Sequence, residues 1–419
     1  MKKVIVVAPI LTRSGYGEHA RFVVEALSKY PEQFDIYVHP LAWGESSWEA
    51  GDPEKRKFYD HLIAKRAQYK GKFDLSVQVT IPPEWQNIAD INVGVTAGVE
   101  TDRCPNAWLP KINEMDKVIV TAEHIKKIFM TTDFEVENQF SKEKVVFRGC
   151  TPPVEVVSYP VREIASKDVS SRLDLKTDFN FLTVAQIAPR KNLFATIEWF
   201  IEEFRNENVG LVVKSHLANN SLLDRARVQD ILTQVINSTG SERSCKIYHI
   251  HGNMSDEELH GLYVNDKIKC MVSTTHGEGF GLPLFEAAYS GLPIVCPSWS
   301  GQTDFLYGPR TKKSGKKEYR AHFEKVKYDI KPVSEDALMA GAIEKGMSWC
   351  YPQKDSFKKA LRNVYQGFEE KKETALQLQD HLCKKFTTEN QHSSMVKAIQ
   401  SAYESKVQWN EDVTEIQVL

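Results

Sequence analysis

Short apolar runs alternate with longer stretches in which apolar residues recur every three or four positions. The run at residues 3–8 is continuous and rich in β-branched residues, as buried parallel strands are, and residues 75–79, 91–95 and 117–121 are further strand candidates. Residues 18–30, by contrast, place their apolar side chains at helical spacing. Strands that alternate with helices in this way predict an α/β protein with a parallel sheet.

The alternation is interrupted by residues 149–172, which are rich in Pro and Ser, and it restarts with the apolar run at residues 179–184. Such a change is typical of a domain junction. We therefore expect two doubly wound, Rossmann-like domains, at residues 1–170 and 171–387. A final helical stretch, 388–419, is expected to pack back on the N-terminal domain.

The overall charge changes this picture little, but two segments differ from the rest. The 419 residues contain 54 Lys and Arg against 56 Asp and Glu, so no whole-protein field attracts a polyanion. The segment 309–331, however, has nine Lys or Arg against three acidic residues, and the segment 43–72 mixes Trp and Tyr with cations. Either segment can be a solvated surface or a contact with phosphates. The second hypothesis assigns duplex DNA to Lys55, Arg56, Lys57 and the 310–331 basic loop.

Cysteine usage and hydropathy bear on the cellular compartment in which the protein is expected. The seven Cys are odd in number and form no C-x-x-C pair, which fits neither a disulfide framework nor a zinc ribbon. No run reaches the roughly 18 apolar residues of a membrane-spanning helix. We expect a cytoplasmic protein without a transmembrane segment; the sequence does not indicate its oligomeric state.

The first glycine cluster is Gly15, Tyr16 and Gly17, with Ala20 three positions later. Its spacing matches the dinucleotide pattern G-x-G-x-x-A only formally, because six residues separate it from the preceding strand and no acid follows the next strand. A nicotinamide or flavin enzyme is therefore disfavoured. The cluster predicts a loop whose backbone approaches a ligand, followed by a helix N-terminus that favours anions.

The second glycine cluster, HGEGFGLPLFE at residues 276–286, directly follows a predicted strand at residues 270–273. Pro283 suits the first turn of a helix, where its missing N–H would have no partner. The amides just before it then converge at the positive end of that helix, where a phosphate is favoured. These amides belong to Gly279, Phe280, Gly281 and Leu282.

Two carboxylates, Glu278 and Glu286, flank this anion site, with seven residues between them. Carboxylates beside phosphate repel it unless they face hydroxyl groups, so we assign both to sugar hydroxyls. The stretch HGEGFGLPLFEAAYSGLPIV resembles the donor-site signature of retaining nucleotide-sugar glycosyltransferases of the GT-B fold, of the family 4 type. The resemblance implies that Glu278 contacts the transferred sugar, that Glu286 contacts the ribose, and that the glycine-loop amides hold the diphosphate.

Further stretches carry the same resemblance across both halves of the chain. VAQIAPRKN, residues 184–192, resembles the loop that gives an Arg and a Lys to the diphosphate, which implies that role for Arg190 and Lys191. The loop around Gly15, Tyr16 and Gly17 resembles the one that closes on the donor from the opposite domain. HGNMSDEELHGLY, residues 251–263, resembles the segment near the nucleotide base.

GVETDRCPNAW, residues 98–108, resembles the loop that faces the acceptor. Many family members have a His in this loop, and this chain has carboxylates instead. Glu100 is therefore a candidate catalytic carboxylate, with a structural cap as the alternative. Thr101, Asp102 and Arg103 are candidates for acceptor contacts.

The chemistry of glycosyl transfer demands cations and N–H dipoles aimed at a leaving diphosphate. The resemblance implies retention of configuration, attack from the same face as the leaving group, and a nucleotide-sugar donor, most simply a UDP-sugar, with no other cofactor. No ligand cluster with metal spacing is evident in the sequence. The active site is expected in a cleft between the two domains, at the carboxyl ends of both sheets.

The sequence leaves two classes of acceptor open, DNA and glycans. SGYGEHAR, TIPPEWQ and GVTAGVETDRCPNAW also resemble glycosyltransferases of tailed bacteriophages, some of which modify hydroxymethylated pyrimidines in DNA; such a protein would work in the host cytoplasm. A polysaccharide or another glycan is the equally weighted alternative. Outside the transferase class, a nucleotide-sugar epimerase and a non-catalytic binding protein remain.

Overall fold

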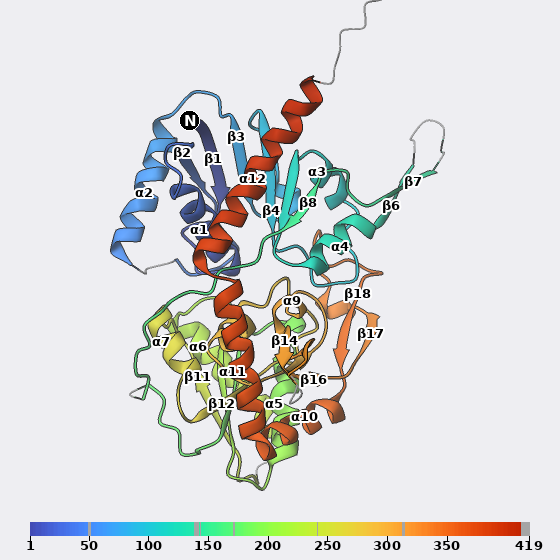
Figure 1. Ribbon diagram of the computed structural model, residues 1–419. Coiled ribbons are helices and arrows are strands. Elements are labelled where there is room, and N and C mark those ends of the chain that lie inside the picture. The colour runs from blue at the N-terminus through green and yellow to red at the C-terminus, as the bar shows by residue number, and fades with distance from the viewer. Residues whose placement is uncertain are drawn as a thin grey trace, which may run out of the picture. The chain divides into compact units, whose positions relative to one another are not determined.

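The computed structural model describes residues 1–48, 52–137, 142, 144–170, 172–240, 242–311 and 315–411 (Figure 1). The chain divides into two compact units. The N-terminal unit contains residues 1–99, 103–160 and the C-terminal segment from Thr388, and the C-terminal unit contains residues 100–102 and 161–387. The chain thus enters its second unit at Val161, before the boundary expected near residue 170.

The N-terminal unit is built on a six-stranded sheet with the order β2-β1-β3-β4-β5-β8, in which all neighbours are parallel. Its strands are β1 (Lys2–Ala8), β2 (Phe34–Pro40), β3 (Leu75–Val79), β4 (Ile91–Thr96), β5 (Lys117–Val120) and β8 (Val154–Val156). The order reverses beside β1. The loops that leave the carboxyl ends of β1 and β3 therefore flank a topological switch point, where open α/β sheets bind ligands.

Helices α1 (Gly15–Ser28) and α12 (Thr388–Glu411) cover one face of this sheet. Val4 and Val6 of β1 share a buried core with Val23 of α1 and with Met395 and Ile399 of α12. The other elements of the unit are α2 (Pro53–Gln68), η1 (Pro82–Glu84), α3 (Trp108–Asn113), α4 (Glu123–Thr131) and the antiparallel hairpin of β6 (Asp133–Glu137) and β7 (Lys144–Arg148), with α1 at Gly15–Ser28 and α12 at Thr388–Glu411. Residues 412–419 of the predicted C-terminal helix lie outside the described residues.

Helix α1 begins three residues earlier than the hydrophobic spacing predicted. The Ser14 side chain accepts a hydrogen bond from the backbone N–H of Gly17, at 3.0 Å, and so caps a helix that starts at Gly15. The expectation of a glycine loop ahead of the helix was therefore wrong. Gly15, Tyr16 and Gly17 form the first helical turn itself, where N–H groups lack partners within the helix.

The same helix buries a histidine. His19 is fully buried, and neither ring nitrogen has a hydrogen-bond partner among the described residues. Its nearest ring is that of Tyr159, with the centroids 5.0 Å apart. Burial disfavours the charged imidazolium and lowers the pKa of His19 to about 3.

This burial makes the N-terminal unit acid-sensitive. Because the pKa of His19 is lower in the folded than in the unfolded chain, protons bind preferentially to the unfolded chain below about pH 6.5. Stability is thus complete above pH 6.5 and is lost progressively down to about pH 3, with a loss of ~2 kcal/mol at pH 5 from this group. Urea unfolding of His19→Leu should show a flatter pH dependence than the wild type.

His61→Leu is the matched control, since His61 is exposed on α2. This control should keep the wild-type pH dependence. An unchanged pH profile for His19→Leu would refute the assignment.

The C-terminal unit repeats the architecture with the order β11-β10-β9-β12-β13-β16, again parallel throughout. Its strands are β9 (Asn180–Gln186), β10 (Gly210–His216), β11 (Lys246–Ile250), β12 (Ile268–Val272), β13 (Ile294–Pro297) and β16 (Glu324–Val326). The first strand, β9, lies in the middle, and its successors extend to one side before the chain returns at β12. The switch point of this sheet is therefore between β9 and β12.

Around this sheet lie helices η2 (Pro189–Lys191), α5 (Leu193–Phe204), α6 (Leu222–Ser238), α7 (Asp256–Tyr263), α8 (Leu282–Tyr289), α9 (Thr303–Leu306), η3 (Glu335–Ala337), α10 (Lys354–Gln366) and α11 (Phe368–Lys385). Their apolar faces bury a core that includes Phe181, Phe200 and Phe357. The predicted pair of parallel α/β, Rossmann-like units is confirmed.

The basic segment 310–331 was expected to be a loop and is mostly strand. Two antiparallel hairpins include most of it: β14 (Tyr307–Thr311) pairs with β15 (Lys317–Ala321), and β17 (Tyr328–Pro332) pairs with β18 (Ser348–Pro352). Tyr, Ile and Val between the cations supply the strand propensity that the charge count concealed. Lys312 and Lys313 lie outside the described residues.

Candidate functional site

The strongest cluster of charged side chains lies at the switch point of the C-terminal unit. Arg190 and Lys191 follow β9, and Glu278 follows β12. Lys191 Nζ donates to both carboxylate oxygens of Glu278, at 2.6 and 2.7 Å, and Arg190 Nη1 lies 3.2 Å from Glu278 Oε2. The structure thus brings together three of the four predicted catalytic residues.

Backbone hydrogen bonds hold the two loops against each other. His276 N donates to the carbonyl oxygen of Arg190 at 2.8 Å, and Thr274 Oγ1 donates to that of Asn192 at 2.9 Å. Asn192 has a left-handed backbone, with φ of 49°, and it ends helix η2 where α5 begins. This sharp turn keeps Arg190 and Lys191 beside the loop that carries Glu278.

The fourth predicted catalytic residue, Glu100, joins this cluster. Residues 100–102 belong to the C-terminal unit, although the chain on both sides belongs to the N-terminal unit. Glu100 Oε1 lies 3.3 Å from Arg190 Nη2, and the Glu100 carbonyl oxygen accepts a hydrogen bond from Trp299 Nε1. Glu100, Arg190, Glu278 and Lys191 therefore form a chain of alternating charges.

Burial makes these charges interact strongly. The Glu278 side chain exposes 10% of its surface, and those of Lys191 and Arg190 expose 16% and 23%. Burial alone would raise the pKa of Glu278, but the charges of Lys191 and Arg190 outweigh it and hold that pKa at about 2. Glu278 is ionised at neutral pH and can accept hydrogen bonds from hydroxyl groups.

The glycine-rich loop after Glu278 is fastened to the turn that follows β13. Ser300 Oγ accepts from Glu278 N at 2.8 Å, and Gly301 N donates to the Glu278 carbonyl oxygen at 2.9 Å. Gly281 caps α8 with φ of 97°, a backbone conformation that L side chains rarely adopt. Helix α8 then begins at Leu282, one residue before the Pro283 that the sequence suggested as its start, and its first amides have no partners within the helix.

Among the four predicted donor residues of this loop, Phe280 serves the core with its side chain. It is 4% exposed, and its ring packs against those of Phe285 and Phe305. Phe280 could therefore contact a ligand only through its backbone. The sequence predicts backbone contacts for Gly279, Gly281 and Leu282 as well.

Glu286 lies on the buried face of α8 and has two polar partners. Its Oε1 accepts from Arg162 Nη2 at 2.8 Å, and its Oε2 accepts from Tyr263 OH at 3.0 Å. Arg162 also pairs with Asp256 at 2.9 Å. The sequence did not identify Arg162, because it lies 124 residues from Glu286 in the proline-rich junction. Tyr263 is the last residue of the stretch 251–263, which resembles the family segment near the nucleotide base.

The residues suggested for acceptor contacts have other partners. Asp102 Oδ1 accepts from Ser348 N at 2.7 Å, and the Asp102 N–H donates back to the Ser348 carbonyl oxygen at 2.8 Å. Thr101 is fully buried, with Oγ1 3.7 Å from Met347 Sδ. Arg103 is exposed and belongs to the N-terminal unit. Their assignment to an acceptor remains a prediction.

In the N-terminal unit, Tyr16 is tied to the carboxyl end of β4. Its hydroxyl lies 2.7 Å from Thr96 Oγ1, and its ring packs against that of Trp43 in a tilted arrangement, with 4.3 Å between the centroids. The donor role of Gly15, Tyr16 and Gly17 remains a prediction, as the site residues above belong to the other unit.

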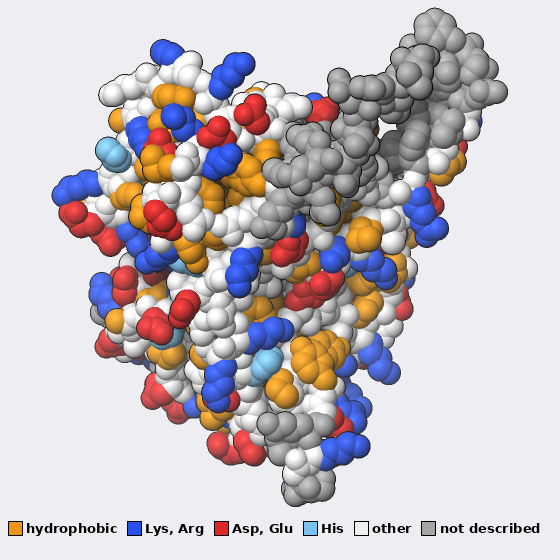
Figure 2. Space-filling view, turned by 45° about the horizontal axis from the view of Figure 1, so that its top comes forward, with side chains coloured by type: hydrophobic (Ala, Val, Ile, Leu, Met, Phe, Trp, Pro, Cys, Tyr) orange, Lys and Arg blue, Asp and Glu red, His pale blue; other side chains and the backbone are white. Residues whose placement is uncertain are grey.

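The cations suggested for DNA are paired with acids. Lys55 Nζ lies 2.9 Å from Glu25 Oε1, and Arg56 and Lys57 pair with acids on their own helix, Asp60 and Glu54. In the other basic segment, Arg320 pairs with Glu318 and Lys331 with Asp329. On the face shown in Figure 2, Lys and Arg side chains are interspersed with Asp and Glu.

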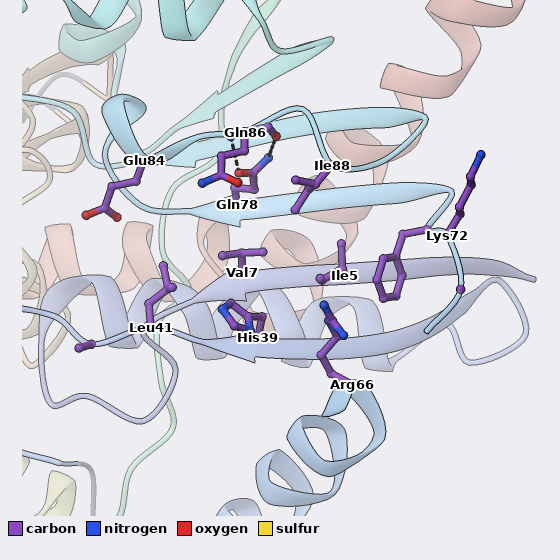
Figure 3. A pocket seen from close by; sticks show the side chains of 13 residues that line it. Ile5, Val7, His39, Leu41, Arg66, Lys72, Gln78, Glu84, Gln86 and Ile88 are labelled. Carbon is purple, nitrogen blue, oxygen red and sulfur yellow. Dashed lines mark hydrogen bonds between the residues drawn. The ribbon is translucent and has the colours of Figure 1, made fainter. Parts of the chain in front are cut away.

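A pocket of about 780 Å³ opens on the sheet of the N-terminal unit, and it includes no predicted site residue (Figure 3). Ile5 and Val7 of β1 line it from the face opposite Val4 and Val6, which α1 and α12 cover. The Gln78 side chain in its wall holds a neighbouring loop, since Oε1 accepts from Gln86 N at 2.8 Å. Gln78 thus has a structural role.

The described part of the chain contains neither a metal-binding cluster nor a membrane-spanning helix. No three His, Cys, Asp or Glu side chains there are placed to hold a metal ion. No described helix combines the length and apolar character needed to span a membrane.

Two family models match the segment that carries this site. Residues 167–306 match "Glycosyl transferases group 1", and residues 253–395 match "Family 4 Glycosyltransferase in conflict systems". The first match includes Arg190, Lys191, Glu278 and Glu286.

Curated relatives are mannosyltransferases. The chain is 26% identical over 288 residues to the MMP alpha-(1->4)-mannosyltransferase of Mycolicibacterium hassiacum, which covers 63% of this chain and 62% of that protein. It is 32% identical over 119 residues to the serotype-specific mannosyltransferase WbdA of Escherichia coli, covering 28% of this chain and 13% of WbdA. The chain thus spans less than two thirds of the length of these relatives.

Solved structures agree in fold. HepE of Anabaena, in complex with UDP and glucose, superposes with a TM-score of 0.62 over 96% of this chain and 100% of that one, at 12% identity. Sucrose-phosphate synthase of Thermosynechococcus elongatus gives a TM-score of 0.60 over 97% and 100%, also at 12% identity. The chain therefore has the GT-B fold, and its residues 167–306, which hold the charged cluster, match the group 1 glycosyltransferases.

Proposed function

We propose that this protein is a glycosyltransferase that moves a sugar from a nucleotide-sugar donor to a hydroxyl acceptor, and that its C-terminal unit holds the donor. The observation that carries the proposal is the contact of Glu278 with Arg190 and Lys191, at the switch point of a parallel sheet and next to the start of α8. The matching family segment covers the same residues.

The geometry suits a diphosphate that leaves with negative charge. Arg190 and Lys191 are cations in a mostly buried site, where charge stabilisation is stronger than in water. The amides at the start of α8 add a positive dipole end. Both features stabilise the departing diphosphate, with no metal ion assigned a part in the step.

Each of the two carboxylates is assigned to a different sugar ring of the donor. Glu278, ionised and close to both cations, is assigned to hydroxyls of the transferred sugar, and Glu286, oriented by Arg162 and Tyr263, to the ribose. Glu100 is assigned to orient Arg190 from its other side. In this scheme the acceptor attacks from the face that the diphosphate leaves, and the configuration of the sugar is retained.

A UDP-sugar is the proposed donor and a glycan the proposed acceptor. Solved GT-B relatives are described in complex with UDP and glucose, and the curated relatives are named mannosyltransferases. Hydroxymethylated DNA is the less supported acceptor, because Lys55, Arg56 and Lys57 are already paired with acids. The bacteriophage origin remains a prediction.

The test is a donor and acceptor matrix. Radiolabelled UDP- and GDP-sugars are each incubated with the protein and with mannose oligosaccharides, plain duplex DNA or hydroxymethylated duplex DNA. We expect label on a glycan from a UDP-sugar, together with slow donor hydrolysis when the acceptor is omitted. Label on hydroxymethylated DNA alone would overturn the glycan acceptor.

The same matrix tests the alternatives to a transferase. A nucleotide-sugar epimerase converts the donor without any acceptor, and a binding protein binds it without turnover. If no donor is hydrolysed or transferred although it binds, the transferase proposal fails.

A further inference from the structure

Three aromatic side chains lie on the segments of the N-terminal unit that follow β1 and β2. The rings of Tyr16, in the first turn of α1, and Trp43 pack in a tilted arrangement with their centroids 4.3 Å apart, and Trp48 lies on the same loop as Trp43. Trp48 exposes 66% of its surface. We call Tyr16, Trp43 and Trp48 the aromatic platform.

The loops of the platform are held together by backbone contacts. Arg13 N donates to the carbonyl oxygen of Ser47 at 2.7 Å, and Thr12 forms an antiparallel bridge with Trp48. The Trp43 carbonyl oxygen accepts from Ser46 Oγ at 2.5 Å. The Tyr16 hydroxyl is fixed by Thr96, at the end of β4. The platform is therefore pre-formed, and little ordering is required of it when a ligand binds.

Its place in the sheet points to a ligand. The loops after β1 and β2 leave the carboxyl edge of the parallel sheet, next to its switch point, where open α/β sheets bind small molecules. A large exposed indole there is unusual, because Trp gains more than most residues from burial. One exposed aromatic side chain would need no explanation, but an exposed Trp on the loop that also supplies Trp43 of the tilted Tyr16–Trp43 pair does.

The charges around the platform favour a neutral ligand. Glu45 is the only charged residue between positions 40 and 48, and one cation, Arg13, lies on the segment whose backbone is bonded to this loop. On helix α2, Lys55, Arg56 and Lys57 each have an acidic partner. A nucleic acid strand needs unpaired cations along its backbone in addition to stacking. A pyranose ring needs only an aromatic surface for its apolar C–H face and nearby polar groups for its hydroxyls.

We propose that the aromatic platform binds a pyranose ring of the glycan acceptor by stacking, with Trp48 as the main contact. The inference rests on the proposed transferase function and adds to it the class of acceptor and the residues that select it. Trp48 determines acceptor affinity, and it takes no part in donor cleavage.

The first experiment measures binding without turnover. The intrinsic fluorescence of the full chain is titrated with mannotetraose and, separately, with a single-stranded oligonucleotide of the same concentration range. We expect saturable quenching by mannotetraose and a Kd that rises about tenfold in Trp48→Ala, the size typical for loss of one stacking contact. Trp48→Phe should recover part of the affinity.

Tyr319→Ala is the matched control, since Tyr319 is also exposed, at 61%, but lies on a hairpin of the C-terminal unit. Its Kd for mannotetraose should equal that of the wild type. Quenching by the oligonucleotide alone, or an equal Kd in Trp48→Ala and the wild type, would overturn the proposal. Circular dichroism of each variant checks that it is folded.

A second measurement separates this proposal from the transferase function. Hydrolysis of the UDP-sugar without acceptor should be unchanged in Trp48→Ala, while transfer to the oligosaccharide falls about tenfold in kcat/KM. Loss of donor hydrolysis in step with transfer would show that Trp48 serves the donor, and the proposal would fail. If the wild type hydrolyses no donor at all, the transferase function fails, and the fluorescence titration still decides on the platform.

Discussion

Glu278→Gln should lower sugar transfer by roughly two orders of magnitude or more, because the variant lacks the charge that is proposed to contact the sugar hydroxyls and that pairs with both cations. It should also destabilise the C-terminal unit. The substitution leaves Arg190 and Lys191 mostly buried with Glu100 as the remaining acid near them, and removal of one partner of a buried pair costs about 3 kcal/mol. Transfer rates and urea unfolding of the same preparation measure both effects.

Glu202→Gln is the matched control in the same unit. Glu202 pairs with Lys354 across the surface, with side chains exposed by 33% and 46%, and such pairs contribute about 0–1 kcal/mol. This variant should keep its activity and nearly all its stability. If Glu278→Gln transferred sugar at the wild-type rate, Glu278 would have only a structural role.

Gly301→Ala should disrupt the loop proposed to hold the donor without replacing any charged side chain. A Cβ at this position would lie 2.1 Å from the Gly279 carbonyl oxygen and 2.9 Å from that of Glu278. Because the clash is with backbone, the 278–281 loop must move, and with it the amides proposed to hold the diphosphate. We expect the KM for the donor to rise by about two orders of magnitude, since small misplacements of catalytic groups are that costly.

Gly367→Ala provides the comparison, because its Cβ would meet one carbonyl, that of Asn363, at 3.1 Å, and its φ of −112° is accessible to alanine. Steady-state kinetics of this variant should match the wild type. An unchanged donor KM in Gly301→Ala would mean that the loop does not hold the donor.

The hydrophobic pattern predicted the sheets well because buried parallel strands are short segments rich in Val, Ile and Leu. The segments 75–79 and 91–95 became β3 and β4. The start of α1 was missed because the Ser14 cap and the glycines of its first turn have no hydrophobic signal. The strands β14, β15 and β17 within residues 307–332 were missed because the many cations of this segment suggested a solvated loop.

The site was predicted as a set of residues and not as a network. Sequence spacing placed Glu278 beside the start of a helix, but the contacts with Arg190 and Lys191 join positions 88 and 87 residues apart. The pairing of Arg162 with Glu286 spans a still longer separation and follows no local pattern. Tertiary contacts of this kind depend on the order of strands in the sheet, which one sequence does not specify.

The alternating chain of Glu100, Arg190, Glu278 and Lys191 has a consequence for how quickly the donor is captured. Its two positive and two negative charges cancel, so the cluster projects little field beyond a Debye length of about 8 Å at physiological salt. Long-range steering of the proposed diphosphate is therefore weak, and the cations act on it only at short range. We expect its capture to depend little on ionic strength.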